Sequence, residues 1–395
     1  MVNKLHVMED ALNKFFIERE DEVHGLSLAL LSGANTLFIG PPGTGKTLLV
    51  NSWAQLINNN THFSWLLHKF MTPDELFGPI SLEGLKNERF VRNTKNKLPE
   101  ATTCFLDEIY KCNAGSLNAL LSVLNERLFH NDGEETRIPL MSVIGASNEL
   151  PEESDNLDAL DDRFSLRYYV RPVKEHGSKI KMYNNADTFS ADKMVSLDEI
   201  TKMRKEVATV EVPDSIADIV VGLISSLRGE GINITDRTFK NSRRLLQAEA
   251  YYNGKDTVDE ACVELLCHSF WRDEKQQPIA HKIILRKVSP EKQQVIELYE
   301  DAEDVFTTAM ATKDPKKRSE EGLEAASKLK TAKKEIHEHL SNMKKANKPI
   351  KDLLELESQL ETWIEEVFKL CGVDFYNYPR RQNNAKGWKK IKKYC

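Results

Sequence analysis

One stretch of the chain has the spacing of a phosphate-binding loop, G-x-x-x-x-G-K-[ST]: Gly40-Pro41-Pro42-Gly43-Thr44-Gly45-Lys46-Thr47. The glycines let backbone N–H groups turn inward around phosphates, and the helix expected from Leu48 onward adds its positive N-terminal end. Lys46 would neutralise the β- and γ-phosphates, and the Thr47 hydroxyl would ligate Mg²⁺. We therefore predict that residues 40–48 bind a nucleoside triphosphate. The alternative is a loop of this shape that no longer binds nucleotide.

A pair of carboxylates, Asp107 and Glu108, closes the apolar run Cys104-Phe105-Leu106. Neighbouring strand residues point to opposite sides, so the two carboxylates cannot share one role while the strand continues. Asp107 is expected to hold Mg²⁺, and Glu108 is expected to polarise the attacking water. Alone, the pair is equally well explained by a solvated turn, and the phosphate-binding loop upstream favours the catalytic interpretation.

Two further polar residues follow apolar or helical segments. Asn148 ends a strand-like run and could orient the attacking water, although asparagine also favours turns and helix caps. Arg163 follows a short helical segment. It is either an arginine finger for the γ-phosphate of a neighbouring subunit or the partner of Asp161 or Asp162 in a local ion pair. The residues alone leave both alternatives open.

Arg237 lies in the first turn of a helix that Thr235 or Asp236 can cap. A cation is disfavoured near the positive end of a helix, so its presence is compatible with a phosphate-sensing role. An ordinary surface arginine is the alternative.

Composition is that of a soluble globular protein: 395 residues, 40% hydrophobic and 29% charged, with a net charge of −6. The length predicts two or three domains. The net charge argues against a globally nucleic-acid-binding surface, and no apolar run is long enough to span a bilayer. The N-terminus lacks the apolar core of a signal peptide, so a cytoplasmic location is expected. Six cysteines lack metal-ligand spacing and are expected to be free thiols: Cys104, Cys112, Cys262, Cys267, Cys371 and Cys395.

Residues 1–172 alternate between short apolar runs and helical stretches, which predicts an α/β domain with a five-stranded parallel sheet. A single helix is expected over residues 12–31. The expected strands are Thr36–Gly40, His62–Leu67, Thr102–Asp107, Leu140–Ala146 and Ser165–Arg171. Residues 173–285 read as a small helical lid domain. Residues 286–375 carry apolar stripes at helical spacing and predict a bundle, with helices from Glu291 to Met310 and on both sides of Asn347-Lys348-Pro349.

Residues 376–395 form a basic, aromatic tail. Such a tail could bind nucleic acid, which would make the chain a nucleic-acid motor or the motor subunit of a DNA-restriction system. A solvated or partner-docking tail is the alternative. A third possibility is a nucleotide-binding scaffold that does not hydrolyse ATP, against which the full set of catalytic residues argues.

The segments GPPGTGKT, FLDEI, ASNELPE, LDDRF and TDRTFKNSRRLLQ, in this order, resemble the MoxR family of AAA+ ATPases and are most similar to its RavA branch. The resemblance implies Walker A for Lys46 and Thr47 and Walker B for Asp107 and Glu108. It implies sensor 1 for Asn148, the arginine finger for Arg163, and sensor 2 on the lid of the same subunit for Arg237. It also places His24 and Gly25 on the adenine side of the nucleotide.

The resemblance further implies two polar excursions that line the pore face of a ring: a helix-2 insert at Gly78–Leu98 and a hairpin at Leu128–Leu140 turning at Asn131-Asp132-Gly133. It implies a homo-hexamer that uses Mg·ATP to remodel client proteins, with a partner that carries a von Willebrand factor A-type domain. RavA carries a β-rich insertion in its helical bundle, and no comparable stretch is found in this sequence. The client, the choice between ATP and GTP, and the ring size are not legible in the residues.

Overall fold

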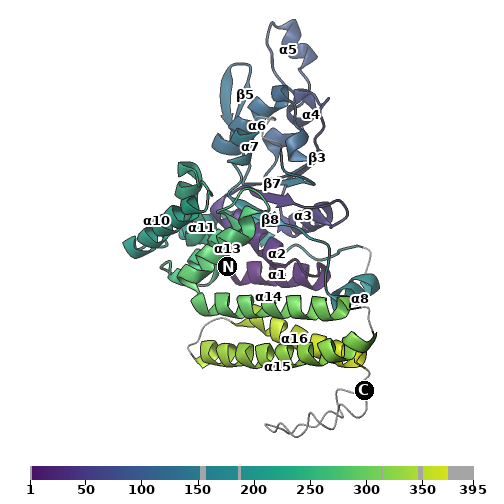
Figure 1. Cartoon of the computed structure of the whole chain (residues 1–395). Coiled ribbons are helices and arrows are strands. Elements are labelled where there is room, and N and C mark those ends of the chain that lie inside the picture. Colours follow the sequence, from purple (N-terminus) through teal and green to yellow (C-terminus); the bar gives the residue numbers. More distant parts are fainter. Residues whose placement is uncertain (1, 152–156, 186–187, 313–314, 346–349, 372–395) are drawn as a thin grey trace. The chain divides into compact units, whose positions relative to one another are not determined.

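The computed structural model describes residues 2–151, 157–185, 188–312, 315–345 and 350–371 (Figure 1). The chain divides into two compact units, Met1–Ile284 and Leu285–Cys395, which are considered separately. Within the described residues, no helix is both long enough and apolar enough to cross a membrane. The described cysteines are free thiols, as predicted, and Cys395 lies outside the described residues.

Five parallel strands form the central sheet, in the order β3-β4-β7-β1-β8. Their bounds are β1 Thr36–Ile39, β3 His62–Leu66, β4 Thr103–Asp107, β7 Ser142–Ser147 and β8 Leu166–Tyr169. Each lies within two residues of its predicted limits, so the predicted α/β fold is confirmed. The three central strands are buried along almost their whole length, because helices cover both faces of a parallel sheet.

The helices that pack around the sheet are α1 Val2–Phe15, α2 Glu20–Ser32, α3 Lys46–Gln55, α6 Ala114–Glu126 and α7 Asp158–Asp161. The prediction of one continuous helix over residues 12–31 is wrong. The chain turns after α1, where Glu18 has a left-handed φ of 56°, and a second helix begins at Glu20. Three acidic residues in the first turn of α2 favour this new start, since they lie at the positive end of the helix.

Two excursions from the sheet are tied to each other. The first contains α4 Pro73–Phe77 and α5 Leu82–Lys86, and the second is the hairpin of β5 Leu128–Asn131 and β6 Glu134–Arg137. Both hairpin turn residues, Asp132 and Gly133, have positive φ, which confirms the predicted turn. The Asp132 carboxylate accepts hydrogen bonds from Arg89 Nε at 2.6 Å and from the Phe90 amide at 2.8 Å.

Helices dominate from residue 176 onward. They are α8 His176–Asn184, α9 Leu197–Val207, α10 Asp214–Gly229, α11 Asp236–Tyr252, α12 Glu260–Val263 and α13 Gln276–Val288. A two-residue strand, β9 Val195–Ser196, pairs with β2 Ile57–Asn58. Single 3₁₀ turns occur at η1 Leu98–Glu100, η2 Ile109–Lys111 and η4 Glu264–His268. Ile200 of α9 and Leu245 of α11 share one apolar core with Leu26 of α2 and Phe38 of β1, so the lid is packed directly onto the α/β part.

The second unit is a bundle of α14 Pro290–Ala311, α15 Pro315–Lys345 and α16 Lys351–Leu370. The ion pairs Lys333–Glu361 and His337–Glu357 run in opposite directions along α15 and α16, so these helices are antiparallel. The predicted apolar stripes lie in or against its core. The structure shows no strand in the part of this unit that it describes, and the basic tail lies outside the described residues.

Candidate active site

The phosphate-binding loop leaves β1 at the end of the sheet where the parallel strands finish, which we call the carboxyl edge. Gly40 packs so closely that an added Cβ would lie 2.2 Å from the Val170 carbonyl oxygen. Gly45 has a φ of 85° and stands at the start of α3, a conformation that residues with a side chain rarely adopt. Exposed Leu48 follows in the first turn of the helix. The sequence therefore builds a tight loop that ends at a helix N-terminus, where phosphates bind.

Lys46 is folded over this loop and is only 7% exposed. Its Nζ donates to the Gly40 and Pro41 carbonyls at 2.5 and 3.0 Å and to Asn148 Oδ1 at 3.1 Å. Burial lowers the pKa of Lys46, while the nearby Asp107 and Glu108 carboxylates oppose that shift. The ammonium thus stands among oxygen acceptors that a triphosphate would replace.

Thr47 and Asp107 lie together, with the Thr47 hydroxyl 3.1 Å from Asp107 Oδ2. A hydroxyl and a carboxylate, completed by phosphate oxygens and water, are the ligands that Mg²⁺ prefers. The pair therefore fits the predicted metal site. The second oxygen of Asp107 accepts the Glu108 amide at 3.0 Å, which fixes the orientation of the carboxylate.

Glu108 turns sharply away from β4, with φ 54° and ψ 47°. Its Oε1 accepts a hydrogen bond from Asn148 Nδ2, and its Oε2 lies 3.2 Å from Lys111 Nζ. Asn148, at the end of β7, therefore bridges Lys46, which follows β1, and Glu108, which follows β4, and β7 lies between these two strands in the sheet. This geometry supports a site role for Asn148 rather than that of an isolated turn residue.

Arg163 lies at the opposite end of the sheet, the amino edge, where β1, β7 and β8 begin. It comes three residues before β8, which pairs in parallel with β1 from Thr36 and Leu166 onward. A four-residue strand spans about 13 Å, so the Arg163 backbone and the phosphate-binding loop of the same chain are a strand length apart. Arg163 thus lies far from the phosphate-binding loop of its own chain.

The Arg163 side chain donates to the Ala159 carbonyl of the preceding helix, and its own carbonyl accepts from Asn35 Nδ2 at 2.9 Å. Burial and the neighbouring Arg237 lower its pKa. Neither Asp161 nor Asp162 forms an ion pair with Arg163 in the described structure, so the local ion-pair alternative does not describe this conformation.

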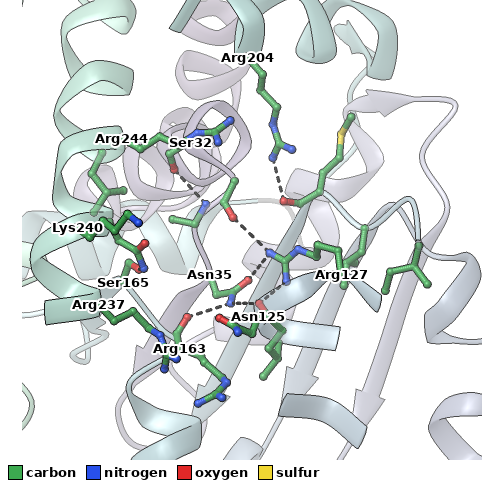
Figure 2. Close-up of a pocket in the computed structure, with 18 of the residues that line it drawn as sticks. Ser32, Asn35, Asn125, Arg127, Arg163, Ser165, Arg204, Arg237, Lys240 and Arg244 are labelled. Carbon is green, nitrogen blue, oxygen red and sulfur yellow. Dashed lines mark hydrogen bonds between the residues drawn. The ribbon is translucent and has the colours of Figure 1, made fainter. Parts of the chain in front are cut away.

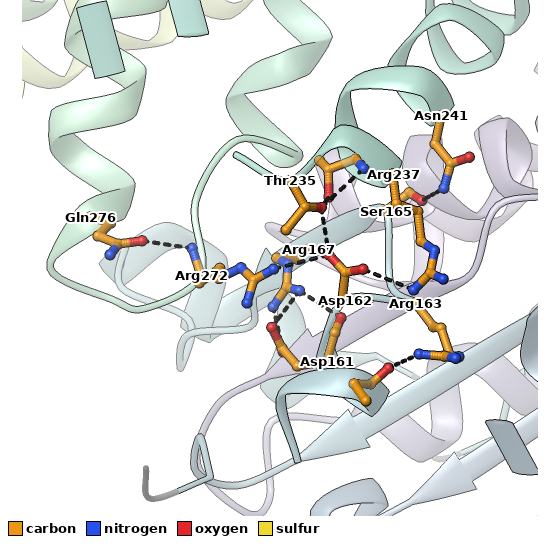
Figure 3. Close-up of polar contacts among 12 residues, drawn as sticks. Asp161, Asp162, Arg163, Ser165, Arg167, Thr235, Arg237, Asn241, Arg272 and Gln276 are labelled. Atoms are coloured by element: carbon orange, nitrogen blue, oxygen red, sulfur yellow. Dashed lines mark hydrogen bonds and ion pairs between the residues drawn. The ribbon is translucent and has the colours of Figure 1, made fainter. Parts of the chain in front are cut away.

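Arg237 lies beside Arg163 rather than beside the loop of residues 40–47 (Figure 3). Its Nη1 pairs with Asp162 Oδ2 at 2.9 Å, and the capping Thr235 hydroxyl donates to Asp162 Oδ1 at 2.6 Å. Its sensor 2 role stays a prediction. Arg237 lies on the lid helix α11, as predicted, but at the amino edge rather than beside the phosphate-binding loop of its own chain. The physical reason is the packing of α11 on α2, which holds the start of α11 at the amino edge.

A basic cavity of about 970 Å³ opens between the amino edge and α11 (Figure 2). Seven cationic side chains and one carboxylate, Asp236, are among its lining residues. The cations are Arg127, Arg137, Arg163, Arg204, Arg237, Lys240 and Arg244. Burial lowers the pKa of Arg127 to about 10 and that of Arg204 to about 9, and both donate to backbone carbonyls. The surface on which Arg163 lies is therefore suited to an anionic partner.

The structure packs His24 and Gly25 against neighbouring elements, and their contact with adenine stays a prediction. The His24 ring bonds Glu249 of α11 at 2.9 Å and Glu9 of α1 at 3.4 Å. Gly25 lies inside α2, where Tyr168 occupies the space of a Cβ, and the helix ends instead at Gly33.

A second cavity, of about 640 Å³, adjoins the phosphate-binding loop at Pro41 and Asn148. Tyr169 and Arg171 line it from the end of β8, and Lys174, Lys179 and Glu274 line it from the lid side. Buried Arg19 stands nearby and donates to the carbonyls of Thr44 and Arg171. Sequence reasoning missed these residues, because no motif marks them and only the fold brings them to the loop.

The parallel sheet, the phosphate-binding loop after β1, the carboxylates after β4 and the packed helical lid together define an ATPase with the AAA+ fold. A family model described as the MoxR domain of MoxR-vWA-beta-propeller ternary systems matches residues 3–205, and an AAA lid domain model matches residues 199–284. The chain belongs to the MoxR family of AAA+ ATPases.

Relatives agree with this assignment. The uncharacterized protein MJ0812 of Methanocaldococcus jannaschii is 39% identical over 270 residues, which cover 68% of this chain and 72% of the relative. Chaperone MoxR1 of Mycobacterium tuberculosis is 25% identical over 57% of this chain and 60% of its own length. The crystal structure of a proposed ATPase from Cytophaga hutchinsonii is similar in fold, with a TM-score of 0.59 at 19% identity over 73% of this chain and 95% of that chain.

Proposed function

We propose that this protein hydrolyses Mg·ATP at a site shared by two copies of the chain in a ring, and that it remodels client proteins as a RavA-like member of the MoxR family. One observation carries the proposal. The groups that bind phosphate and activate water lie at the carboxyl edge, whereas Arg163 lies at the amino edge. An arginine finger in this position acts on the nucleotide of the next subunit.

The roles of the chain's own residues follow from the geometry. The loop amides and Lys46 hold the triphosphate, and Thr47 and Asp107 hold Mg²⁺, which neutralises charge on the phosphates. Glu108 accepts the proton of the attacking water, and Asn148 orients that water. Arg163 of the next copy stabilises the charge that develops on the transferred phosphoryl group. Tyr169 and the cavity beside Pro41 offer a surface for the base.

The client-facing surface is the pair of tied excursions. Phe70 is 91% exposed, Leu82 78% and Phe90 65%, so this part of the chain presents apolar side chains to solvent. The Asp132 bonds connect the insert to the hairpin that precedes β7 and Asn148. A rearrangement around Asn148 would therefore move both excursions together against a client. The description of the matched MoxR domain supports a partner with a von Willebrand factor A-type domain.

The test is the dependence of the ATPase rate on assembly. Wild-type protein is studied by sedimentation velocity with and without Mg·ATP, and its specific activity is measured over the same concentrations. A shared site predicts that activity per chain falls as the protein dissociates on dilution. A monomer with full activity at every concentration would contradict the proposal.

A further inference from the structure

We propose that Tyr110 is a positioning residue that links the chain's own ATP site to the Arg163 that it offers to the next subunit. The inference rests on the proposed function, in which Arg163 acts across the contact between two copies. It assigns a task to a hydrogen bond that the hydrolytic chemistry itself does not use.

The link begins at η2, the 3₁₀ turn that directly follows Glu108. Lys111, the last residue of this turn, reaches back to Glu108 Oε2 at 3.2 Å. Tyr110 bonds in another direction, and its hydroxyl donates to Asp161 Oδ1 at 2.5 Å. A single tight turn thus carries a contact to the general base and a contact to the loop before β8. A movement of Glu108 away from Asn148 and Lys111 would therefore reach Tyr110 through the backbone of this turn.

The second step is Asp161, which anchors the Arg163 loop. Arg167 donates to both carboxylate oxygens of Asp161, at 2.7 and 2.8 Å, and the two side chains are only 3% and 8% exposed. The Asp161 carbonyl also accepts the Phe164 amide at 3.1 Å, which closes a turn around Arg163. Because the loop between these contacts is so short, a shift of Asp161 displaces Arg163.

The third step connects the same loop to the lid (Figure 3). Asp162 accepts from Thr235, from Arg237 and, at 2.9 Å, from Arg272. Asp161 is therefore joined to the ATP site and Asp162 to the lid, and Arg163 is the next residue in the sequence. Tyr110 joins these contacts to the turn after Glu108, in which Lys111 contacts the Glu108 carboxylate.

The choice of tyrosine supports the assignment. Burial and the neighbouring Asp161 raise the pKa of Tyr110 far above its usual value, so the hydroxyl stays protonated as a donor. Phenylalanine would fill the same space without that donor. Tyr110→Phe is consequently a small change that removes the hydrogen bond to Asp161 and keeps the aromatic side chain.

The experiment mixes variants in equal amounts and measures the ATPase rate per total chain. The Lys46→Ala variant keeps Arg163 but has no working phosphate site. The Arg163→Ala variant keeps the phosphate site but lacks the arginine. Tyr110→Phe alone should lower kcat about tenfold, since a small misplacement of a catalytic group is costly. It should leave nucleotide affinity and urea stability close to wild type. Tyr251→Phe, which loses a hydrogen bond to Glu206 in the lid, is the matched control and should keep full activity.

The proposal predicts asymmetric rescue. Tyr110→Phe mixed with Lys46→Ala should exceed the rate of diluted Tyr110→Phe about fivefold, because intact arginines then face intact phosphate sites. Mixing it with Arg163→Ala should give no rescue. Rescue by Arg163→Ala alone would mean that Tyr110 supports the ATP site of its own chain. Equal rates in both mixtures would mean that Tyr110 only contributes to packing. Either outcome overturns the inference. If Lys46→Ala and Arg163→Ala do not rescue each other, the shared site itself fails.

Discussion

The two edges of the sheet hold their functional groups in different ways. At the carboxyl edge Asn148 bonds to both Lys46 and Glu108, so these three predicted site residues are held together within one chain. At the amino edge Arg237 and Arg272 bond to Asp162, a residue next to Arg163, and Arg163 itself bonds to a backbone carbonyl. The difference supports our proposal that the carboxyl edge supplies the chemistry within one chain and that the amino edge presents cations to another.

The largest expected effect comes from removing the amino-edge half of the site. Arg163→Ala should lower kcat by about 10³–10⁵ with nucleotide affinity little changed, because the guanidinium acts on the transition-state charge. Steady-state ATPase assays and nucleotide titration measure the two quantities. Arg243→Ala, an exposed arginine on α11, is the control. Near-normal activity of Arg163→Ala would mean that the two edges are not halves of one site.

Glu108→Gln should lower kcat by about 10²–10⁴, because glutamine cannot accept the proton of water. Nucleotide should still bind, since Lys46 and the loop remain. Glu149 is exposed and follows Asn148 in the sequence, so Glu149→Gln is the control and should keep its activity. If Glu108→Gln turns over ATP at a normal rate, the water-activating role at the carboxyl edge is wrong.

Loss of the buried ion pair at the amino edge should lower the free energy of unfolding more than loss of an exposed ion pair elsewhere. Arg167→Met leaves the Asp161 carboxylate buried without its cation and should cost about 3–5 kcal/mol in the free energy of unfolding. Lys255→Met breaks the exposed pair with Asp259 and should cost less than about 1 kcal/mol. Urea unfolding compares the two. Equal losses would show that the Asp161–Arg167 pair does not hold the loop in place.

The smallest effect concerns the clamp between α11 and the first two helices. Burial disfavours charged His24, but its hydrogen bonds to Glu249 and Glu9 outweigh burial and raise its pKa to about 10. A raised pKa stabilises the fold at neutral pH and below, and this contribution is lost as pH rises through about 10. His24→Gln should therefore lose about 1–3 kcal/mol at pH 7, and the difference from wild type should shrink toward pH 10. A difference that does not change with pH would contradict this assignment.

The carboxyl edge was largely predictable from sequence, because its groups follow apolar strands at fixed offsets. Asp107 ends β4, Glu108 and Asn148 directly follow β4 and β7, and Lys46 closes the loop after β1, and parallel strands bring such ends together. The hairpin turn at Asp132 and Gly133 was predictable for a similarly local reason, since its residues tolerate positive φ.

The amino edge was predictable only in part. The LDDRF segment marks Arg163, but the partners of Asp161 and Asp162 come from β8, α11 and residue 272, which are far apart in the sequence. The hydrogen bonds of His24 could not be predicted for the same reason, because its carboxylate partners lie on α1 and α11. Which cation meets which acid depends on how the lid packs, and no periodicity in the sequence records that packing.

The central claim is that one ATP site needs two chains, and mixing two inactive variants tests it most directly. Lys46→Ala and Arg163→Ala are each purified and shown to be folded, and then combined in equal amounts with Mg·ATP. We expect recovery to about a quarter of the wild-type rate, because random assembly sets an intact loop against an intact arginine at about one contact in four. A mixture as inactive as its components, although the variants assemble together, would contradict it.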